Sequence, residues 1–203
     1  MEDALLWGCF GLGLLASLGN LTGFLTSLLT EYRYWPPGER DWRYYVHWTL
    51  SNLLNVAFVG VAYLDWNSLG LPRPTSLYAG LALFVPFYLA ALAAGLDLGG
   101  EETMGLSGDL RTGGWYRYSR NPQYVCYMVA TIGFALLVNS VLVTILAVIF
   151  ASWWVLLPFV EEPWLREEYG EEYDQYASRV PRFVGLGTLR ALSGGGLHRH
   201  QRE

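Results

Sequence analysis

Residues 122–159 read PQYVCYMVATIGFALLVNSVLVTILAVIFASWWVLLPF. Two uncharged apolar runs, at about Pro122–Val138 and Val141–Phe159, are separated only by Asn139 and Ser140. A run of about 18 or more apolar residues is long enough to cross a bilayer as a helix. Two such runs with so short a connection predict a tight helical hairpin, whose limbs pack antiparallel or re-enter the membrane together.

Three further apolar segments precede this hairpin, at about Ala4–Leu29, Tyr44–Leu64 and Ser76–Leu96. The chain has 203 residues, of which 53% are hydrophobic and 15% charged, and the charged residues gather between the apolar segments. We therefore predict an all-α polytopic membrane protein with about five transmembrane helices. The first segment opens with Glu2 and Asp3 rather than a basic region, and its apolar run is too long for a secretory signal peptide, so we expect it to be retained.

The distribution of arginine predicts the orientation of these spans. All 13 basic residues are arginine, and most lie in the connections 30–43 and 97–121 or in the tail after Pro158. With five spans, these three regions fall on one face of the membrane. The positive-inside rule then predicts an integral protein of the cell membrane with its amino terminus outside and its carboxyl terminus in the cytoplasm. A net charge of -5 argues against nucleic acid as a partner.

The tail after the hairpin has a different character. Residues 161–177 have high helical propensity, with acidic residues on one face. The apolar and aromatic residues of the opposite face are Leu165, Tyr169, Tyr173 and Tyr176. We expect a cytoplasmic amphipathic helix with Pro163 in its first turn, where a missing N–H is harmless. Beyond Gly185 the chain is rich in glycine and arginine and is expected to be disordered.

Small residues four apart in the apolar segments predict places where helices approach closely. The pairs Gly19 with Gly23 and Gly95 with Gly99 have this spacing. His47 stands near the start of the second apolar segment. A histidine there is more often a satisfied interfacial residue than a ligand.

Two polar groups flank the hairpin. Glu161 and Glu162 follow its second limb at the water–lipid boundary, and neighbouring side chains on a helix point about 100° apart. We expect one of them to face inward and one outward; alternatively, both are an acidic helix start that favours the macrodipole. Before the first limb, Pro122 suits the first helical position and Asn121 a helix cap. Arg120 by itself would be an interfacial anchor.

Together the two flanks form an ordered pattern. An RNPxY stretch, the hairpin and then EExxLxxxYGxxYxxYxxxVPR resemble the isoprenylcysteine carboxyl methyltransferase and phospholipid methyltransferase superfamily of integral membrane enzymes. The resemblance covers about residues 112–183, whereas the first three spans resemble that family only in being spans. The matching residues are Thr112, Gly113, Tyr116, Arg120, Pro122, Tyr124, Glu161, Glu162, Leu165, Tyr169, Gly170, Tyr173, Tyr176, Val180, Pro181 and Arg182.

The resemblance implies an S-adenosylmethionine-dependent methyltransferase whose lipophilic acceptor enters from the bilayer. Carboxylates and tyrosine faces would hold the cations of the cofactor, and an arginine its carboxylate. The residues implied as catalytic are Glu162, Arg120 and Glu161, and no metal is implied. Those implied in cofactor binding are Tyr116, Arg120, Asn121, Pro122, Tyr124, Glu161, Glu162, Tyr169, Tyr173, Tyr176, Arg179 and Arg182.

Residues 1–110 would then carry substrate-facing spans, residues 111–184 the cofactor-binding region and residues 185–203 a tail. The chain departs from the family at Asn121, where relatives carry histidine, and just before Glu161, where relatives often carry an arginine that Arg166 would replace. The acceptors left open are an isoprenylcysteine-type carboxylate, an isoprenoid acid, a lipid amine and a thiol. Two alternatives to a methyltransferase are a membrane reductase of the sterol-reductase type with a nicotinamide cofactor and a non-catalytic scaffold.

Overall fold

This computed structural model describes residues 1–185 and 188, and every regular element within them is a helix. The elements in order are α1 (Glu2–Leu29), α2 (Trp42–Leu64), α3 (Arg73–Leu98), α4 (Gly100–Thr103), the 3-10 helix η1 (Gly114–Arg117), α5 (Pro122–Val138) and α6 (Val141–Arg179). In these residues the only β pairing is an isolated bridge between Gly38 and Leu106. The all-α prediction is confirmed. Most of the tail that we expected to be disordered lies outside the described residues.

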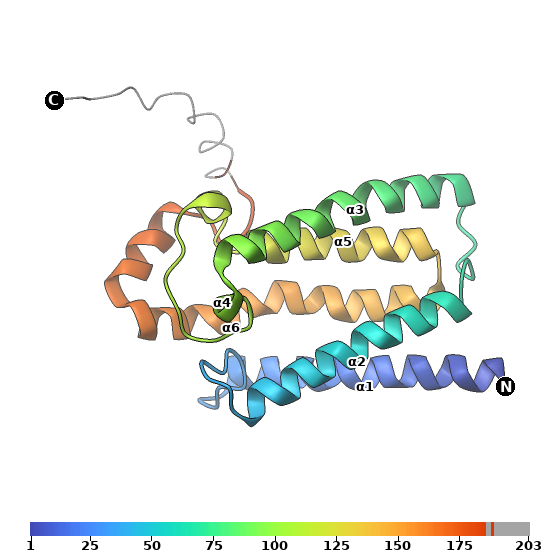
Figure 1. The fold of residues 1–203 in the computed structure, drawn as a ribbon, viewed down its shortest axis with the longest axis horizontal. Coiled ribbons are helices and arrows are strands. Elements are labelled where there is room, and N and C mark those ends of the chain that lie inside the picture. The colour runs from blue at the N-terminus through green and yellow to red at the C-terminus, as the bar shows by residue number, and fades with distance from the viewer. Residues whose placement is uncertain (186–187, 189–203) are drawn as a thin grey trace, which may run out of the picture.

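Helix α6 lies between two helix pairs (Figure 1). On one side α3 packs along α5, and on the other α1 packs along α2. Helix α6 contacts α5 and α1 and touches α2 more lightly, while α2 and α3 make almost no contact with one another. The bundle is therefore two layers joined through α6, with a gap between the outer helices α2 and α3.

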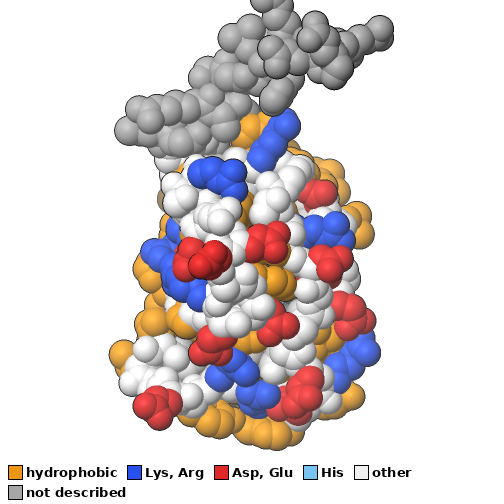
Figure 2. Space-filling view, turned by 90° about the vertical axis from the view of Figure 1, so that its left-hand side faces the viewer, with side chains coloured by type: hydrophobic (Ala, Val, Ile, Leu, Met, Phe, Trp, Pro, Cys, Tyr) orange, Lys and Arg blue, Asp and Glu red, His pale blue; other side chains and the backbone are white. Residues whose placement is uncertain are grey.

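The flanks of the bundle are apolar. Helices α1, α3 and α6 are each long and apolar enough to cross a membrane, and α5 is an apolar helix of 17 residues. Leu15, Val59 and Val148 are 75%, 69% and 67% exposed, which suits a lipid environment far better than water. Charged side chains gather on the end of the molecule that carries the bend of α6 (Figure 2). These features fit a polytopic membrane protein, and the count of five spans stays a prediction.

The predicted hairpin between α5 and α6 is present. Asn139 adopts the left-handed conformation (φ 58°), which asparagine tolerates better than most residues. Ser140 then caps α6, because its Oγ accepts a hydrogen bond from the N–H of Val143 at 3.0 Å. The side-chain amide of Asn139 also donates to Asn67 Oδ1 and to the carbonyl of Leu71. The turn therefore also fastens the connection between α2 and α3.

The amphipathic helix predicted to begin at Glu161 does not begin there, because α6 continues through Glu161 and Pro163 and kinks only at Gly170. The part of α6 before the kink, residues 141–169, is about 44 Å long and extends beyond the hydrocarbon core. Pro163 lies inside α6 rather than in a first turn, and each internal proline removes only one helical hydrogen bond. The direction changes instead at Gly170, whose φ of 54° only glycine adopts readily.

The closest helix contact joins α3 and α5. A Cβ atom added at Gly133 would lie 2.4 Å from the backbone nitrogen of Phe84, and one at Gly80 would lie 2.4 Å from that of Leu137. The glycine pairs that the sequence suggested do not meet a helix backbone in this way. Gly23, for instance, faces the ring of Tyr34. Gly19 and Gly95 do lie close to the opposite helix, where an added Cβ would lie 3.1 Å from Leu50 and 2.6 Å from Gln123. The predicted close approach is therefore confirmed at one glycine of each pair, because the contact depends on the partner helix and not on spacing alone.

We expect Gly133→Ala to lower the free energy of unfolding by about 1–3 kcal/mol, since a methyl group there must push α3 and α5 apart. The measurement is thermal unfolding of the detergent-purified protein. Gly11→Ala is the matched control, because a Cβ at Gly11 meets nothing within 4 Å and alanine has the higher helix propensity. Equal melting temperatures for the two variants would contradict the close contact.

Candidate functional site

At the polar end of the bundle, Glu162 is enclosed by three arginines, and only 5% of its side chain is exposed. Arg182 donates from Nε to Oε1 at 2.6 Å and from Nη2 to Oε2 at 2.7 Å. Arg120 Nη1 lies 3.0 Å from Oε1, and Arg166 Nη2 lies 3.6 Å from Oε2. Arg166, which we considered as a replacement for the arginine that relatives often carry before Glu161, therefore does contact the carboxylate of Glu162.

The neighbouring Glu161 has a different environment. Its Oε1 accepts hydrogen bonds from the hydroxyl of Tyr124 at 2.5 Å and from Trp35 Nε1 at 2.6 Å. Within the described residues, no cationic group forms an ion pair with it. Glu161 and Glu162 both face the same cavity. The expectation that one of them would point outward was wrong.

The two environments separate the pKa values of the pair. Both residues follow the apolar part of α6 at 141–159, at the end of the helix that leaves the predicted span. Burial raises the pKa of Glu161 to about 7, against the hydrogen bonds from Tyr124 and Trp35, and the charge of Glu162 adds to the rise. Burial acts on Glu162 in the same direction, but the hydrogen bond from Arg182 and the charges of the three arginines outweigh it and lower its pKa. Glu162 is therefore ionised at neutral pH, while Glu161 is poised to gain or lose a proton.

The segment after α6 folds back onto the start of α5. The backbone N–H of Arg120 donates to the carbonyl of Pro181 at 2.9 Å. The carbonyl of Arg182 accepts from Ser119 Oγ at 3.2 Å and from Asn121 Nδ2 at 3.0 Å. Asn121 holds the cap position of α5, but its side chain caps nothing. Asn121 is therefore the cap residue, as predicted, but its amide binds the returning chain.

A small cavity of about 90 Å³ lies beneath this junction, between α4, η1, the start of α5 and α6. Most residues that the sequence suggested for a site line it, namely Tyr116, Arg120, Asn121, Tyr124, Glu161, Glu162, Tyr169, Tyr173 and Tyr176. Pro122, Arg179 and Arg182 do not line it. Arg182 contacts Glu162 from outside the cavity, and Arg179 is exposed with its Nε bonded to the carbonyl of Gln175.

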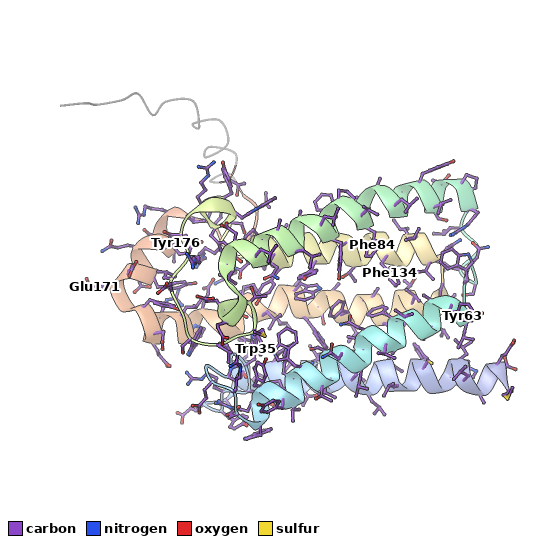
Figure 3. All side chains as sticks on the ribbon, viewed as in Figure 1. Trp35, Tyr63, Phe84, Phe134, Glu171 and Tyr176 are labelled. Carbon is purple, nitrogen blue, oxygen red and sulfur yellow. The ribbon has the colours of Figure 1, made fainter. Side chains whose placement is uncertain are left out.

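We call the small cavity the polar cavity. Three tyrosines form its aromatic wall. Tyr116, Tyr173 and Tyr176 are buried together, and the hydroxyl of Tyr176 donates to the carbonyl of Tyr116 at 2.7 Å. Burial raises the pKa of Tyr116, and the charge of Glu161 adds to the rise, so its hydroxyl stays protonated. In Figure 3, Tyr176 lies near the bundle while Glu171 lies at the outer bend of α6. The predicted division of this segment into an aromatic and an acidic face is confirmed.

Sequence reasoning missed several residues of the polar cavity. Glu102 and Asp109 line it from the connection between α3 and α5, and Glu102 Oε1 accepts from the N–H of Asp109 at 3.0 Å. Trp35, in the connection between α1 and α2, supplies a hydrogen bond to Glu161 across 126 residues of chain. Trp35 and Asp109 lie in irregular segments and Glu102 in the four-residue helix α4, which is too short to show periodicity, so no sequence pattern marked them.

A second, larger cavity of about 610 Å³ lies inside the bundle next to the first. Its wall is mainly aromatic, with Tyr127 stacked on Trp154 at 4.8 Å and Phe84 beside Phe134 at 5.3 Å between ring centroids (Figure 3). None of the described residues that line it is charged. We call it the aromatic cavity. Its lining includes Val59 on α2 and Tyr88 on α3, the two helices that barely touch.

Glu161 stands at the boundary between the two cavities. Tyr124, which donates to it, lines both cavities, and Trp35 lines the aromatic cavity. Thr103 and Gln123 also line both. The two cavities therefore share a wall formed by Thr103, Gln123 and Tyr124. Glu161 lines the polar cavity and is hydrogen-bonded to two residues that line the aromatic cavity.

Comparison with known protein families assigns the segment that carries these features. Residues 75–172 match the family model described as phospholipid methyltransferase. This segment, just under half of the chain, is similar to phospholipid methyltransferases. Searches of curated proteins and of solved structures gave no match.

The match confirms the family resemblance and extends it. The domain includes Arg120, both glutamates and Tyr169, as expected, and it also includes α3 from residue 75, which the sequence linked to the family only as a span. Helices α1 and α2 lie outside it. The family supports a membrane methyltransferase of the lipid type. Within the described residues, no group of three or more His, Cys, Asp or Glu side chains is arranged to hold a metal.

We expect Arg182→Met to destabilise the protein by about 3 kcal/mol, because it breaks a nearly buried ion pair from one side and leaves Glu162 short of cations. The control is Arg179→Met, three residues away on the exposed surface, for which we expect a change within about 0.5 kcal/mol. Thermal unfolding in detergent measures both. An Arg182→Met variant as stable as the control would mean that Glu162 does not depend on this contact.

Proposed function

We propose that the protein is an S-adenosylmethionine-dependent methyltransferase of the membrane, which transfers a methyl group to an uncharged nucleophile on a lipophilic acceptor. The observation that carries this proposal is the position of Glu161 between a polar cavity and an aromatic cavity. The polar cavity would face the cytoplasm, in keeping with the arginine distribution. The aromatic cavity would face the bilayer through the gap between α2 and α3.

The residues of the polar cavity suit the cofactor. Arg120 lines the cavity, and its buried Nε has no hydrogen-bond partner among the described residues. An arginine with a free donor is well matched to the carboxylate of the cofactor. The tyrosine wall offers ring faces for the adenine and for a sulfonium or ammonium. Glu162 is already paired with arginines, so we assign it the positioning of Arg120 rather than direct catalysis.

Cofactor binding would require the polar cavity to widen. Ligand sites are commonly about 300–1,000 Å³, whereas this cavity has about 90 Å³. The connection 104–113 forms part of its wall. Gly105 and Ser107 are hydrogen-bonded to Gly38, whereas residues 108–113 contain no helix or strand. We therefore expect this connection to move outward when the cofactor enters.

The aromatic cavity favours an acceptor without charge. A carboxylate placed there would be buried without a cationic partner, which is strongly unfavourable. This argues against the isoprenylcysteine-type carboxylate and the isoprenoid acid among the acceptors considered. A thiol, or a lipid amine in its neutral form, can enter such a cavity without that penalty. The cavity's size and aromatic wall suit an apolar chain attached to the nucleophile.

In this mechanism, Glu161 is the general base. Bound S-adenosylmethionine would supply an electrophilic methyl group. The Glu161 carboxylate accepts the proton that the nitrogen or sulfur of the acceptor loses as that atom forms its bond to carbon. Tyr124 and Trp35 fix the direction of the carboxylate through their hydrogen bonds. The surrounding rings exclude water and keep the reacting atoms aligned.

The family match favours this function over the two alternatives. A reductase of the sterol-reductase type would bind a nicotinamide cofactor, and a scaffold would bind neither cofactor. Each alternative makes a separate prediction for the binding experiment below.

We expect S-adenosylhomocysteine to bind the detergent-purified protein with micromolar affinity, measured by calorimetry. Arg120→Lys should weaken binding about tenfold, or about 1.4 kcal/mol, because lysine keeps the charge beside Glu162 but loses the Nε donor. Arg33→Lys is the matched control. Arg33 also has a buried Nε without a partner among the described residues, but it lies outside the polar cavity.

The following outcomes would count against this site. Absence of S-adenosylhomocysteine binding by protein of normal melting temperature would contradict the methyltransferase. Binding of NADPH in its place would favour the reductase, and binding of neither would favour the scaffold. Equal weakening in both arginine variants would mean that the effect does not come from the polar cavity.

We expect the rate of methyl transfer to a lipophilic thiol such as 1-dodecanethiol to rise with pH and to level off above about pH 7. Glu161 must be ionised to accept a proton, and burial raises its pKa to about 7, so the base form is lost as the pH falls through that value. Glu161→Gln should remove this rise and lower the plateau rate at least 100-fold, since a general base contributes about 10²–10⁴. A variant that keeps the wild-type pH profile would exclude Glu161 as the base.

A further inference from the structure

His47, on α2, lines the aromatic cavity and is only 6% exposed. No described residue offers a hydrogen-bond partner to its buried Nδ1. The sequence suggested a satisfied histidine at the membrane interface, and that prediction was wrong. Buried polar atoms without partners are rare in native proteins and call for an explanation.

The surroundings of His47 offer its ring nothing but aromatic faces. Its ring centroid lies 4.0 Å from that of Trp35, 5.3 Å from that of Trp48 and 5.7 Å from that of Phe24. The polar side chain of Asn20, which bonds to the backbone of His47, has its other partners elsewhere. Asn20 donates to the backbone carbonyl of His47 and to Ser51 Oγ, and it accepts from the hydroxyl of Tyr34.

Trp35 links this histidine to the candidate base. One face of its indole packs against His47, while its Nε1 donates to Glu161 Oε1 at 2.6 Å. A group that binds to His47 from inside the aromatic cavity is therefore separated from Glu161 by a single indole ring. This is the end of the aromatic cavity nearest the polar cavity.

We propose that His47 forms a hydrogen bond with the uncharged polar head of the acceptor, an N–H, S–H or O–H group on an apolar chain, and so selects headed chains over plain hydrocarbon. The proposal rests on the proposed function in taking the aromatic cavity as the acceptor site. A neutral imidazole has one donor and one acceptor nitrogen. It can therefore pair with each of these heads without adding a charge to the cavity. In the absence of a ligand, its Nδ1 is unpaired and almost without accessible surface, at the expense of stability. The imidazole must therefore turn to present this nitrogen to a ligand in the aromatic cavity.

The test compares wild type with His47→Phe in lipid nanodiscs. The probes are 1-dodecanethiol and dodecylamine, with dodecane as the chain without a head, and binding is followed by quenching of tryptophan fluorescence. We expect His47→Phe to weaken binding of the thiol, the amine or both about tenfold and to leave dodecane binding unchanged. The probe that binds more weakly to His47→Phe than to wild type identifies the chemical class of the acceptor's polar head. His47→Gln, which keeps a donor and an acceptor, should retain most of the affinity.

A structural role would give a different result. If His47 only fills space, His47→Phe and His47→Gln would alter thiol, amine and dodecane binding equally, and the proposal would be overturned. It would also be overturned if wild type bound headed and headless chains with the same affinity. We expect His47→Phe to melt no lower than wild type, since phenylalanine suits an aromatic surrounding. If it does not fold, the comparison of His47→Gln with wild type across the three probes still decides.

The same samples keep this inference separate from the proposed function. S-adenosylhomocysteine binding is measured in each, and we expect it to stay within twofold of wild type in both variants, because His47 does not line the polar cavity. Head-selective binding that depends on His47, without S-adenosylhomocysteine binding by wild type, would support the histidine site and refute the methyltransferase. S-adenosylhomocysteine binding by wild type, without head-selective binding that depends on His47, would support the methyltransferase proposal and refute the histidine site.

Discussion

The polar end of the molecule depends on the ion pairs of Glu162. Arg120 reaches this carboxylate from the start of α5, and Arg182 reaches it from the segment after α6. A buried carboxylate is tolerated only with such partners, so the two segments are drawn to one point. Once there, the backbone of residues 119–121 bonds to that of residues 181–182 and closes the polar cavity. The shape of the candidate site therefore follows from neutralising one charge.

The adjacent glutamates show how position on a helix sets chemistry. Glu162 meets guanidinium groups, whereas Glu161, one residue earlier, meets a phenol and an indole. The arginines lower the pKa of Glu162, whereas burial without a cationic partner raises that of Glu161 to about 7, so the same residue type takes two roles. Separation of the pKa values of neighbouring acids is a recurrent basis for acid–base chemistry in proteins. Here it is achieved by a turn of about 100° between neighbouring side chains.

The sequence predicted local features well and long-range contacts poorly. The hairpin at Asn139 and the aromatic face at Tyr173 were predictable because each depends on neighbours along the chain. The close approach at Gly133 depends on which helix lies opposite, and no spacing rule contains that information. The bond between Trp35 and Glu161 joins distant segments, so the base could be suggested from the family pattern but its orientation could not. His47 was misjudged because satisfaction of a polar atom is a property of its surroundings.

The near absence of contact between α2 and α3 determines which measure of ligand concentration applies to the aromatic cavity. A ligand that arrives through that gap is drawn from a two-dimensional reservoir, so occupancy of the aromatic cavity follows its mole fraction among the surrounding lipids rather than its amount per volume of buffer. Diluting a vesicle suspension would leave occupancy unchanged, whereas adding inert lipid would lower it. Under the proposed function, single-chain detergents would belong to the same reservoir and would compete for the cavity, so the solubilising medium would itself act as an inhibitor.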